Sequence, residues 1–241
     1  MKIISYVQPR RVAFGNGSAV KCVEDVLGLG LHRAFVVTGP PIRPLVEPLV
    51  EGLRRGGVSV GVYAKISTEP TIATLDEALE EAKGFDPDLV IGFGGGSSMD
   101  VAKLVASLPG SGQSVEEVFG INLLASRQTY LILLPTTAGT GSEVSPNAII
   151  GDEAAKLKKA VVSPHLVADA AYVDPLLTMT VPPAVTAATG MDALTHCIEE
   201  YANRFAHPVI DLYALQGIRL IAANLLRAVE KGDDEQARAK V

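Results

Sequence analysis

The chain has 241 residues, of which 48% are hydrophobic, and its formal net charge at pH 7 is −6. This composition predicts a globular protein with a sizeable core, built as one large domain or as one domain with part of another. The negative charge argues against a surface for nucleic acid or an anionic membrane, and no apolar run approaches the length expected of a membrane span. The start of the chain is unlike a signal peptide, so we expect Cys22 and Cys197 to be reduced thiols in a cytoplasmic protein.

Strand-like and helix-like segments alternate through the first half of the chain. The predicted strands are short apolar runs bounded by turn residues, and they cover residues 12–14, 34–38, 58–63, 88–91 and 130–134. The predicted helices have apolar residues at helical spacing, and they cover residues 18–27, 45–55 and 71–83 and the segment after residue 96. This alternation predicts an α/β fold with an open, Rossmann-like, mostly parallel sheet.

The pattern changes in the second half of the chain. Residues 147–174 read as short strands and turns, and residues 184–201 and 208–229 as helices. The change of character at residues 181–183 predicts a domain boundary near Thr180. We therefore expect an α/β domain over residues 1–180, followed over residues 181–241 by the start of an all-α domain.

Three consecutive glycines, Gly94, Gly95 and Gly96, join the strand at residues 88–91 to the helix that follows. Glycines permit a sharp turn and let a ligand approach the backbone without a Cβ in the way. The N–H groups that open a helix are unpaired and carry the positive end of its dipole, which favours an anion. We interpret the turn as a phosphate cradle, to which Ser97 adds a hydroxyl. A tight turn without a ligand has the same pattern, and the run is neither a Gly-x-Gly-x-x-Gly nor a Walker loop.

Two other predicted strands end in residues suited to a ligand. The first ends at Thr38 and Gly39, and the second runs into a loop at residues 135–143 that is rich in threonine, serine and glycine. In open parallel sheets, ligands bind beyond the carboxyl ends of the strands. The second loop alone is equally typical of an ordinary polar loop. Beside the glycine turn, we favour a shared ligand with a sugar-phosphate or adenine group.

Asp192 and His196 lie four residues apart in the predicted helix at residues 184–201. At that spacing, two side chains share a helix face and can reach one cation. A carboxylate oxygen with an imidazole nitrogen suits Fe²⁺ or Zn²⁺. The same spacing also describes an ordinary helix-surface pair, and two ligands do not complete a metal site.

Three segments in one order resemble the iron-dependent (group III) alcohol dehydrogenase family, which shares its fold with glycerol dehydrogenase and dehydroquinate synthase. They are residues 94–103, with the glycines, Asp100 and Lys103; residues 135–143; and residues 190–196, with Asp192 and His196. The likeness extends along essentially the whole chain. It implies that residues 1–180 form a dinucleotide-binding domain and that residues 181–241 begin an all-helical metal and substrate domain, with a metal and a nicotinamide in the cleft between the two.

The resemblance also implies an activity. The expected reaction is a reversible hydride transfer between an alcohol and an aldehyde or ketone, with NAD or NADP as cofactor. Asp192 and His196 would be two of four ligands to Fe²⁺, or to Zn²⁺, which would polarise the alcohol oxygen. The expected substrate is a small alcohol or aldehyde.

The cofactor-binding residues are likewise implied by the resemblance. Residues 95–97 would hold the pyrophosphate, the threonines of residues 136–140 would line the adenine and ribose, and Lys158 would contact the nicotinamide ribose. The expected set is Thr38, Gly39, Gly94, Gly95, Gly96, Ser97, Asp100, Thr136, Thr137, Thr140, Ser142, Asn147 and Lys158.

The chain departs from the family in two ways. Many members carry an acidic residue after the strand that ends at Thr38, where it binds the adenosine ribose, and this chain has Gly39. A carboxylate would repel a 2′-phosphate, so we expect NADPH to be tolerated. The family is also considerably longer, and His32, His165 and His207 match none of the further histidines of its helical domain. We therefore expect either a fragment of a full dehydrogenase or a truncated product that is inactive alone.

Other functions remain open at this point. A glycerol dehydrogenase or a hydroxyacid–oxoacid transhydrogenase would have the same fold, and a non-catalytic nucleotide-binding module is a further alternative. No nucleic acid or membrane partner is expected. We expect a homodimer or higher oligomer, because family members commonly dimerise through N-terminal strands and residues 2–7 suit such a strand. Without more of the helical domain, the apolar faces of residues 184–229 would be exposed or would associate with another chain.

Overall fold

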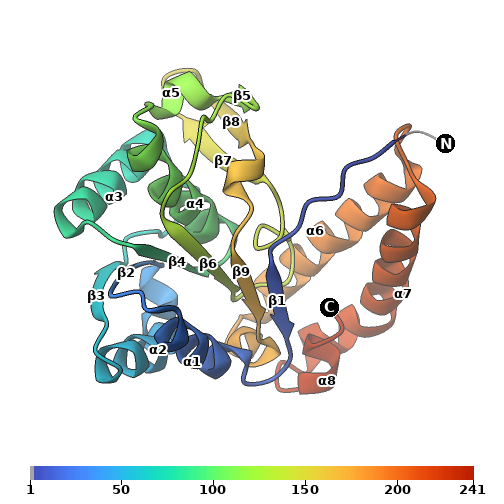
Figure 1. Cartoon of the computed structure of the whole chain (residues 1–241). Helices are drawn as coiled ribbons and strands as arrows, with labels where there is room; N and C mark the ends of the chain where they lie inside the picture. Colours follow the sequence, from blue (N-terminus) through green and yellow to red (C-terminus); the bar gives the residue numbers. More distant parts are fainter. Residues whose placement is uncertain (1–2) are drawn as a thin grey trace. The chain divides into compact units, whose positions relative to one another are not determined.

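The computed structural model describes residues 3–241, and their contacts divide into two compact units (Figure 1). The first unit consists of residues up to 135 together with residues 142–173. The second consists of residues 136–141 and 174–241. The second unit thus begins a few residues before position 180, and it includes a short loop from the middle of the chain.

The first unit is built on a six-stranded parallel sheet with the strand order β1-β9-β6-β4-β2-β3. Its strands are β1 (Arg11–Phe14), β2 (Arg33–Val37), β3 (Ser59–Tyr63), β4 (Leu89–Gly94), β6 (Tyr130–Pro135) and β9 (Ala170–Val173). The helices of this unit are α1 (Ser18–Leu29), α2 (Arg43–Arg55), α3 (Ile72–Phe85), α4 (Gly96–Ser111) and α5 (Val115–Val118), with single 3₁₀ turns η1 (Pro40–Ile42) and η2 (Pro164–Leu166). The predicted α/β fold with a mostly parallel sheet is confirmed.

A second, three-stranded sheet has the order β5-β8-β7. It contains β5 (Gly120–Ile121), β7 (Asn147–Asp152) and β8 (Leu157–Val162). β7 and β8 form an antiparallel hairpin, which is the region where the sequence predicted short strands and turns. β7 also contacts α4, so this hairpin belongs to the same unit as the glycine turn.

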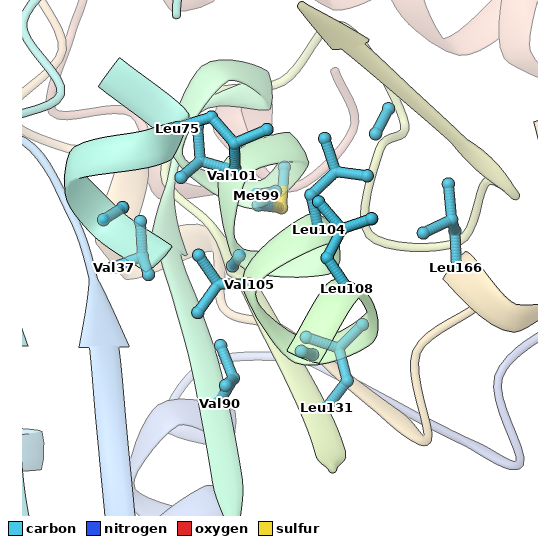
Figure 2. Close-up of a cluster of buried hydrophobic side chains, with 14 of the residues drawn as sticks. Val37, Leu75, Val90, Met99, Val101, Leu104, Val105, Leu108, Leu131 and Leu166 are labelled. Carbon is cyan, nitrogen blue, oxygen red and sulfur yellow. The ribbon is translucent and has the colours of Figure 1, made fainter. Parts of the chain in front are cut away.

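Helix α4 lies at the centre of the hydrophobic core of the first unit. Every residue from position 98 to position 108 is buried, and so is every residue of β4. Figure 2 shows Val105 and Leu108 of α4 beside Val90 and Leu131 of the sheet, with Leu75 of α3 in the same cluster. α4 is therefore buried on all sides over these residues, and the core holds both the helix and the turn that precedes it.

The second unit is helical. It contains the 3₁₀ turn η3 (Pro175–Thr178) and the helices α6 (Pro183–Ala202), α7 (Pro208–Glu230) and α8 (Glu235–Arg238). Glycines allow α6 and α7 to pack closely, since a Cβ on Gly190 would lie 2.3 Å from Leu225 Cδ1 and one on Gly217 would lie 2.6 Å from Cys197 Sγ. Arg238 of α8 donates to Thr186 Oγ1 of α6 at 2.9 Å and so ties the last helix to this pair.

Large apolar side chains remain exposed on α6, on α7 and in the turn between them, as the sequence predicted. They include Met191, Ile198, Tyr201, Phe205, Val209, Leu212, Tyr213 and Leu226. Among the described residues, α7 is also long and apolar enough to cross a membrane, with a mean hydropathy of 1.4 over 18 residues. The expectation that no segment approaches that length was therefore wrong. Core helices of water-soluble proteins meet the same two criteria, so α7 by itself assigns no membrane.

The N-terminal segment differs from the strand suggested by its sequence. Residues 3–7 form no strand within the described chain, and their side chains are exposed. Lys2, the first residue of the suggested strand, lies outside the described residues. The part of this segment in an oligomer therefore stays a prediction.

Candidate functional site

The glycine turn has the geometry of an anion-binding helix start. β4 ends at Gly94, Gly95 is the N-cap of α4, and the helix begins at Gly96. No side chain caps this end, and the first turn contains no acidic residue. The opening N–H groups are therefore not occupied by a capping side chain, and the positive end of the helix dipole is not neutralised locally. A phosphate group bound here would accept hydrogen bonds from these N–H groups and would be attracted by the positive end of the dipole.

Close packing alone, without a ligand, explains why positions 92 and 94 are glycines. A Cβ on Gly92 would lie 2.6 Å from Leu133 Cδ2 and 3.2 Å from Met99 Cα. A Cβ on Gly94 would lie 2.6 Å from Ser98 Oγ. Strand β4 and helix α4 can approach each other this closely only because neither position has a side chain.

The three strand ends predicted to carry ligand-binding residues belong to neighbouring strands. β4 lies between β6 and β2, with Gly94 paired to Pro135 and Gly92 paired to Val37. The loops that start at Thr38, Gly95 and Thr136 therefore leave the sheet from adjacent strands at the same edge. Residues 136–141 themselves belong to the second unit.

The end of β2 has no room for a side chain at Gly39. A Cβ there would lie 2.4 Å from the carbonyl oxygen of Ile66, which is a backbone atom. The segment around Ile66 is held in place, because its N–H donates to the carbonyl of Thr38 at 3.2 Å. Thr38 is fully buried, and its Oγ1 has no hydrogen-bond partner in the part of the chain that the structure describes. The structure thus places the Thr38 side chain beneath the surface.

A buried network centred on Lys103 joins α4 to the segment at residues 142–149. The Lys103 ammonium donates to Ser142 Oγ at 2.8 Å and to the carbonyl oxygens of Asn147 at 2.6 Å and Ser145 at 3.1 Å. Ser142 Oγ in turn donates to Asp100 Oδ1 at 2.6 Å. The N–H of Ile149 donates to Asp100 Oδ2 at 2.9 Å. Two predicted cofactor residues, Asp100 and Ser142, thus bind each other.

Burial governs the charges of this network. It lowers the pKa of Lys103 from 10.5 to about 8, although the nearby carboxylates of Asp100 and Glu143 act in the opposite direction. Burial also raises the pKa of Asp100 and of Glu143. Both effects have one cause, since a low-dielectric interior disfavours the charged form of any group.

The hairpin of β7 and β8 carries the last two predicted cofactor residues of the first unit. Asn147 starts β7; its carbonyl is bound by Lys103, while the residue as a whole is exposed. Lys158 is exposed on β8 and forms an ion pair with Glu69. An exposed pair of this kind contributes about 0–1 kcal/mol, so a ligand can replace it at little cost.

Asp192 and His196 lie on one face of α6, with Oδ1 and Nε2 3.6 Å apart. Both side chains are about half exposed, and the two atoms are close enough to serve one cation. The described residues contain no group of three or more histidine, cysteine or acidic side chains that could hold a metal. The chain thus presents two donors of a suitable kind, and other ligands would have to come from elsewhere.

A cavity of about 1000 Å³ in the first unit lies at the other end of the sheet. Its lining includes Asp88, Tyr130 and Asp169, which stand at the amino ends of β4, β6 and β9. Arg127 also lines the cavity, but its guanidinium is engaged by Asp169 and by backbone carbonyls. This cavity is distant from the glycine turn, and we assign it no role.

Two family models together match nearly the whole chain. Residues 9–175 match the model "Iron-containing alcohol dehydrogenase". Residues 186–241 match "Fe-containing alcohol dehydrogenase family, C-terminal". The chain belongs to the iron-containing alcohol dehydrogenase family. The resemblance proposed from three sequence segments is thereby confirmed.

Individual members of the iron-containing alcohol dehydrogenases agree with this assignment. The chain is 41% identical over 243 residues to long-chain-alcohol dehydrogenase 1 of Geobacillus thermodenitrificans, covering 99% of this chain and 61% of that protein. It is 36% identical over 231 residues to sulfoacetaldehyde reductase of Bilophila wadsworthia, covering 95% of this chain and 60% of that protein. The chain therefore spans about three fifths of the length of these curated relatives.

Solved structures show the same fold. An alcohol dehydrogenase from Oenococcus oeni superposes with a TM-score of 0.95 at 32% identity, covering 99% of this chain and 63% of that one. Sulfoacetaldehyde reductase from Bifidobacterium kashiwanohense, in complex with NAD⁺, superposes with a TM-score of 0.92 at 32% identity, covering 100% of this chain and 64% of that one.

Sequence reasoning missed the role of Lys103. It appeared only as part of a matched segment, although the two residues on either side of it in the helix are apolar. A lysine in such a helix, three residues after an aspartate, is a signal that both are buried as a pair. The structure bears this out, because Lys103 is fully buried and Asp100 nearly so.

Proposed function

We propose that the chain provides the nicotinamide-binding part, and two metal ligands, of a metal-dependent alcohol dehydrogenase. The reaction would be a reversible hydride transfer between an alcohol and an aldehyde or ketone, with NAD(P) as cofactor. The observation that carries the proposal is the uncapped glycine turn between β4 and α4, in a chain that belongs to this family. Relatives named as NAD-dependent methanol dehydrogenase and 1,3-propanediol dehydrogenase support this reaction class.

The residues of the first unit would bind and orient the dinucleotide. The N–H groups that open α4 would hold the pyrophosphate, with Ser97 beside them. The loop after β6 would line the adenine and ribose, and Lys158 would exchange its partner Glu69 for the nicotinamide ribose. The donor pair on α6 fits a divalent cation with borderline ligand preference, Fe²⁺ or Zn²⁺. When bound, the cation supplies Lewis acidity toward an alcohol oxygen and the nicotinamide supplies the hydride acceptor.

The proposal includes acceptance of NADP(H). Its support is the absence of a carboxylate at Gly39 and the lack of room for any side chain there. It also includes a cytoplasmic location, consistent with two free cysteines, and assembly into a homodimer or higher oligomer. The particular alcohol is not assigned, because the relatives' names range from sulfoacetaldehyde to choline and long-chain alcohols.

The first test is a fluorescence titration of the full-length protein with NADH and NADPH, with and without Fe²⁺ or Zn²⁺. We expect saturable binding of both nucleotides, and we expect metal to be required for oxidation of a panel of primary alcohols. Gly94→Val should abolish nucleotide binding, since a side chain at that position meets Ser98.

The metal is tested separately with Asp192→Asn and His196→Ala. Both variants should bind NADH as the unaltered protein does, but bind Fe²⁺ weakly when the metal content is measured after dialysis. His32→Ala, a histidine outside the proposed site, is the matched control and should retain metal. Absence of binding for both nucleotides in the unaltered protein would refute the proposed function. Equal metal content in all four proteins would refute the assignment of the two ligands.

A further inference from the structure

Lys103 is a charged residue in the most apolar part of the molecule. It is 0% exposed, in a helix whose residues from position 98 to position 108 are all buried. Removing an ammonium from water costs several kcal/mol, and an apolar side chain of similar size at such a site is often as stable or more stable. Stability alone is therefore a poor explanation for a lysine at this position, and its hydrogen bonds must be considered.

The contacts of Lys103 all lead to one segment. Its Nζ lies within 3.3 Å of four oxygens, and these belong to Ser142, Ser145 and Asn147. Asp100, one helical turn earlier, accepts from Ser142 Oγ and from the N–H of Ile149. The side chains of Lys103 and Asp100, one helical turn apart on α4, thus bind five backbone or hydroxyl atoms of four residues in the segment 142–149.

The two segments that are joined in this way are both expected to contact the dinucleotide. α4 opens at the glycine turn, and the other segment carries Ser142 and Asn147. Lys103 binds the backbone carbonyl of Asn147, and Asn147 is exposed, so its side chain can reach a ligand. We propose that Lys103, with Asp100, is a positioning residue that sets residues 142–149 relative to the glycine turn, so that both segments fit one bound dinucleotide. This inference rests on the proposed function.

The experiment compares Lys103→Met with the unaltered full-length protein, because methionine keeps much of the side-chain volume and removes all donors. Three quantities are measured: the melting temperature, hydrogen exchange of the amides of residues 142–149, and the dissociation constant for NADH. Lys83→Met is the matched control, since Lys83 is exposed on α3. If Lys103→Met does not fold, Ser145→Ala serves as a milder variant, because it removes only the 3.3 Å contact.

Lys103→Met is expected to fold, to exchange the Ile149 amide faster, and to bind NADH about tenfold more weakly, the size of a lost hydrogen bond to a charged group. Ser145→Ala should change both quantities in the same direction but less, and Lys83→Met should change neither. Unchanged NADH affinity together with faster exchange would overturn the positioning role and leave a structural network only. Unchanged exchange would overturn it as well. If the unaltered protein bound neither NADH nor NADPH, the proposed function itself would fail. If the unaltered protein bound NADH and Lys103→Met bound it equally well, only this inference would fail.

Discussion

At the scale of single residues, the absence of a side chain is as informative as its presence. Gly39 follows β2 where many family members have an acidic residue. A carboxylate there would repel a 2′-phosphate, and the structure shows in addition that a side chain at this position has no room. Any Cβ at this position would meet the carbonyl oxygen of Ile66 at 2.4 Å. An acidic residue here would therefore require the backbone around Ile66 to move.

Replacement of Gly39 separates the steric effect from the charge effect. We expect both Gly39→Ala and Gly39→Asp to lower the free energy of unfolding by about 1–3 kcal/mol, because the new Cβ overlaps backbone. Only Gly39→Asp should also weaken the binding of NADPH relative to that of NADH, by about tenfold, because the carboxylate repels the 2′-phosphate. Urea denaturation and nucleotide titration measure the two effects. An unchanged ratio of NADPH to NADH affinity in Gly39→Asp would contradict the role assigned to this position.

The lowered pKa of Lys103 predicts how the free energy of unfolding depends on pH. Its pKa in the folded chain is about 8, below the ordinary value of 10.5, because burial disfavours the charged form. Between these two values the unfolded chain binds more protons at this group than the folded chain does, so the contribution of Lys103 to the free energy of unfolding increases as the pH rises from 8 to 10.5. The difference in free energy of unfolding between the unaltered protein and Lys103→Met should therefore grow in favour of the unaltered protein over that range. Urea denaturation at several pH values measures it, and a difference that is constant with pH would count against the expectation.

At the scale of elements, the geometry of the proposed phosphate-binding turn depends on the contact between β4 and α4. The strand is buried throughout and the helix is buried from residue 98 to residue 108, and Gly92 packs directly against Ala102 and Met99 of α4. The buried strand and the buried helix therefore hold the turn between them in place, so the helix end would already be formed before a ligand binds. Preorganisation of this kind lowers the ordering cost of binding.

Gly92→Ala tests that contact. The new Cβ would lie 2.6 Å from Leu133 Cδ2 and 2.8 Å from Ala102 Cβ, so we expect a loss of about 1–3 kcal/mol in the free energy of unfolding, together with weaker NADH binding. Gly28→Ala is the control, because no atom of the described residues, apart from the backbone of α1 itself and the two adjoining residues, lies within 4 Å of the Cβ position. It should be neutral or stabilising by up to about 1 kcal/mol. Equal stability of the two variants would show that the helix and the strand have more freedom than the structure indicates.

At the scale of the whole molecule, the chain consists of a well-buried α/β unit and a helical unit with much exposed apolar surface. Leu212 and Leu226 of α7 are 71% and 67% exposed. Exposed apolar area of this kind drives association, either with another part of a longer protein or with another copy.

We expect the double variant Leu212→Gln and Leu226→Gln to associate less than the unaltered chain. Sedimentation velocity over a range of protein concentrations measures this, and Val20→Gln, at a 66% exposed position of α1, is the control. The control should sediment as the unaltered chain does. Identical sedimentation of the double variant would show that these side chains take no part in association.

Local sequence determined much of this protein. Short apolar runs, apolar residues at helical spacing, and the glycines between them were enough to predict the parallel α/β fold, the helical region after residue 181 and the glycine turn at residues 94–96. These features depend on residues that are close together in the sequence, so they can be predicted from the local sequence pattern. The family likewise followed from three contiguous segments.

Only the tertiary structure decided which residues meet across long separations. Lys103 and Asn147 are 44 positions apart, Gly39 and Ile66 are 27 apart, and the contact of Lys103 depends on how β7 packs on α4. The sequence predicted that Asp100 and Ser142 contact the cofactor, which stays a prediction; the structure adds that their side chains bind each other. Whether a polar side chain faces a ligand or another side chain depends on how segments far apart in the sequence pack together. That packing cannot be predicted from a local sequence pattern.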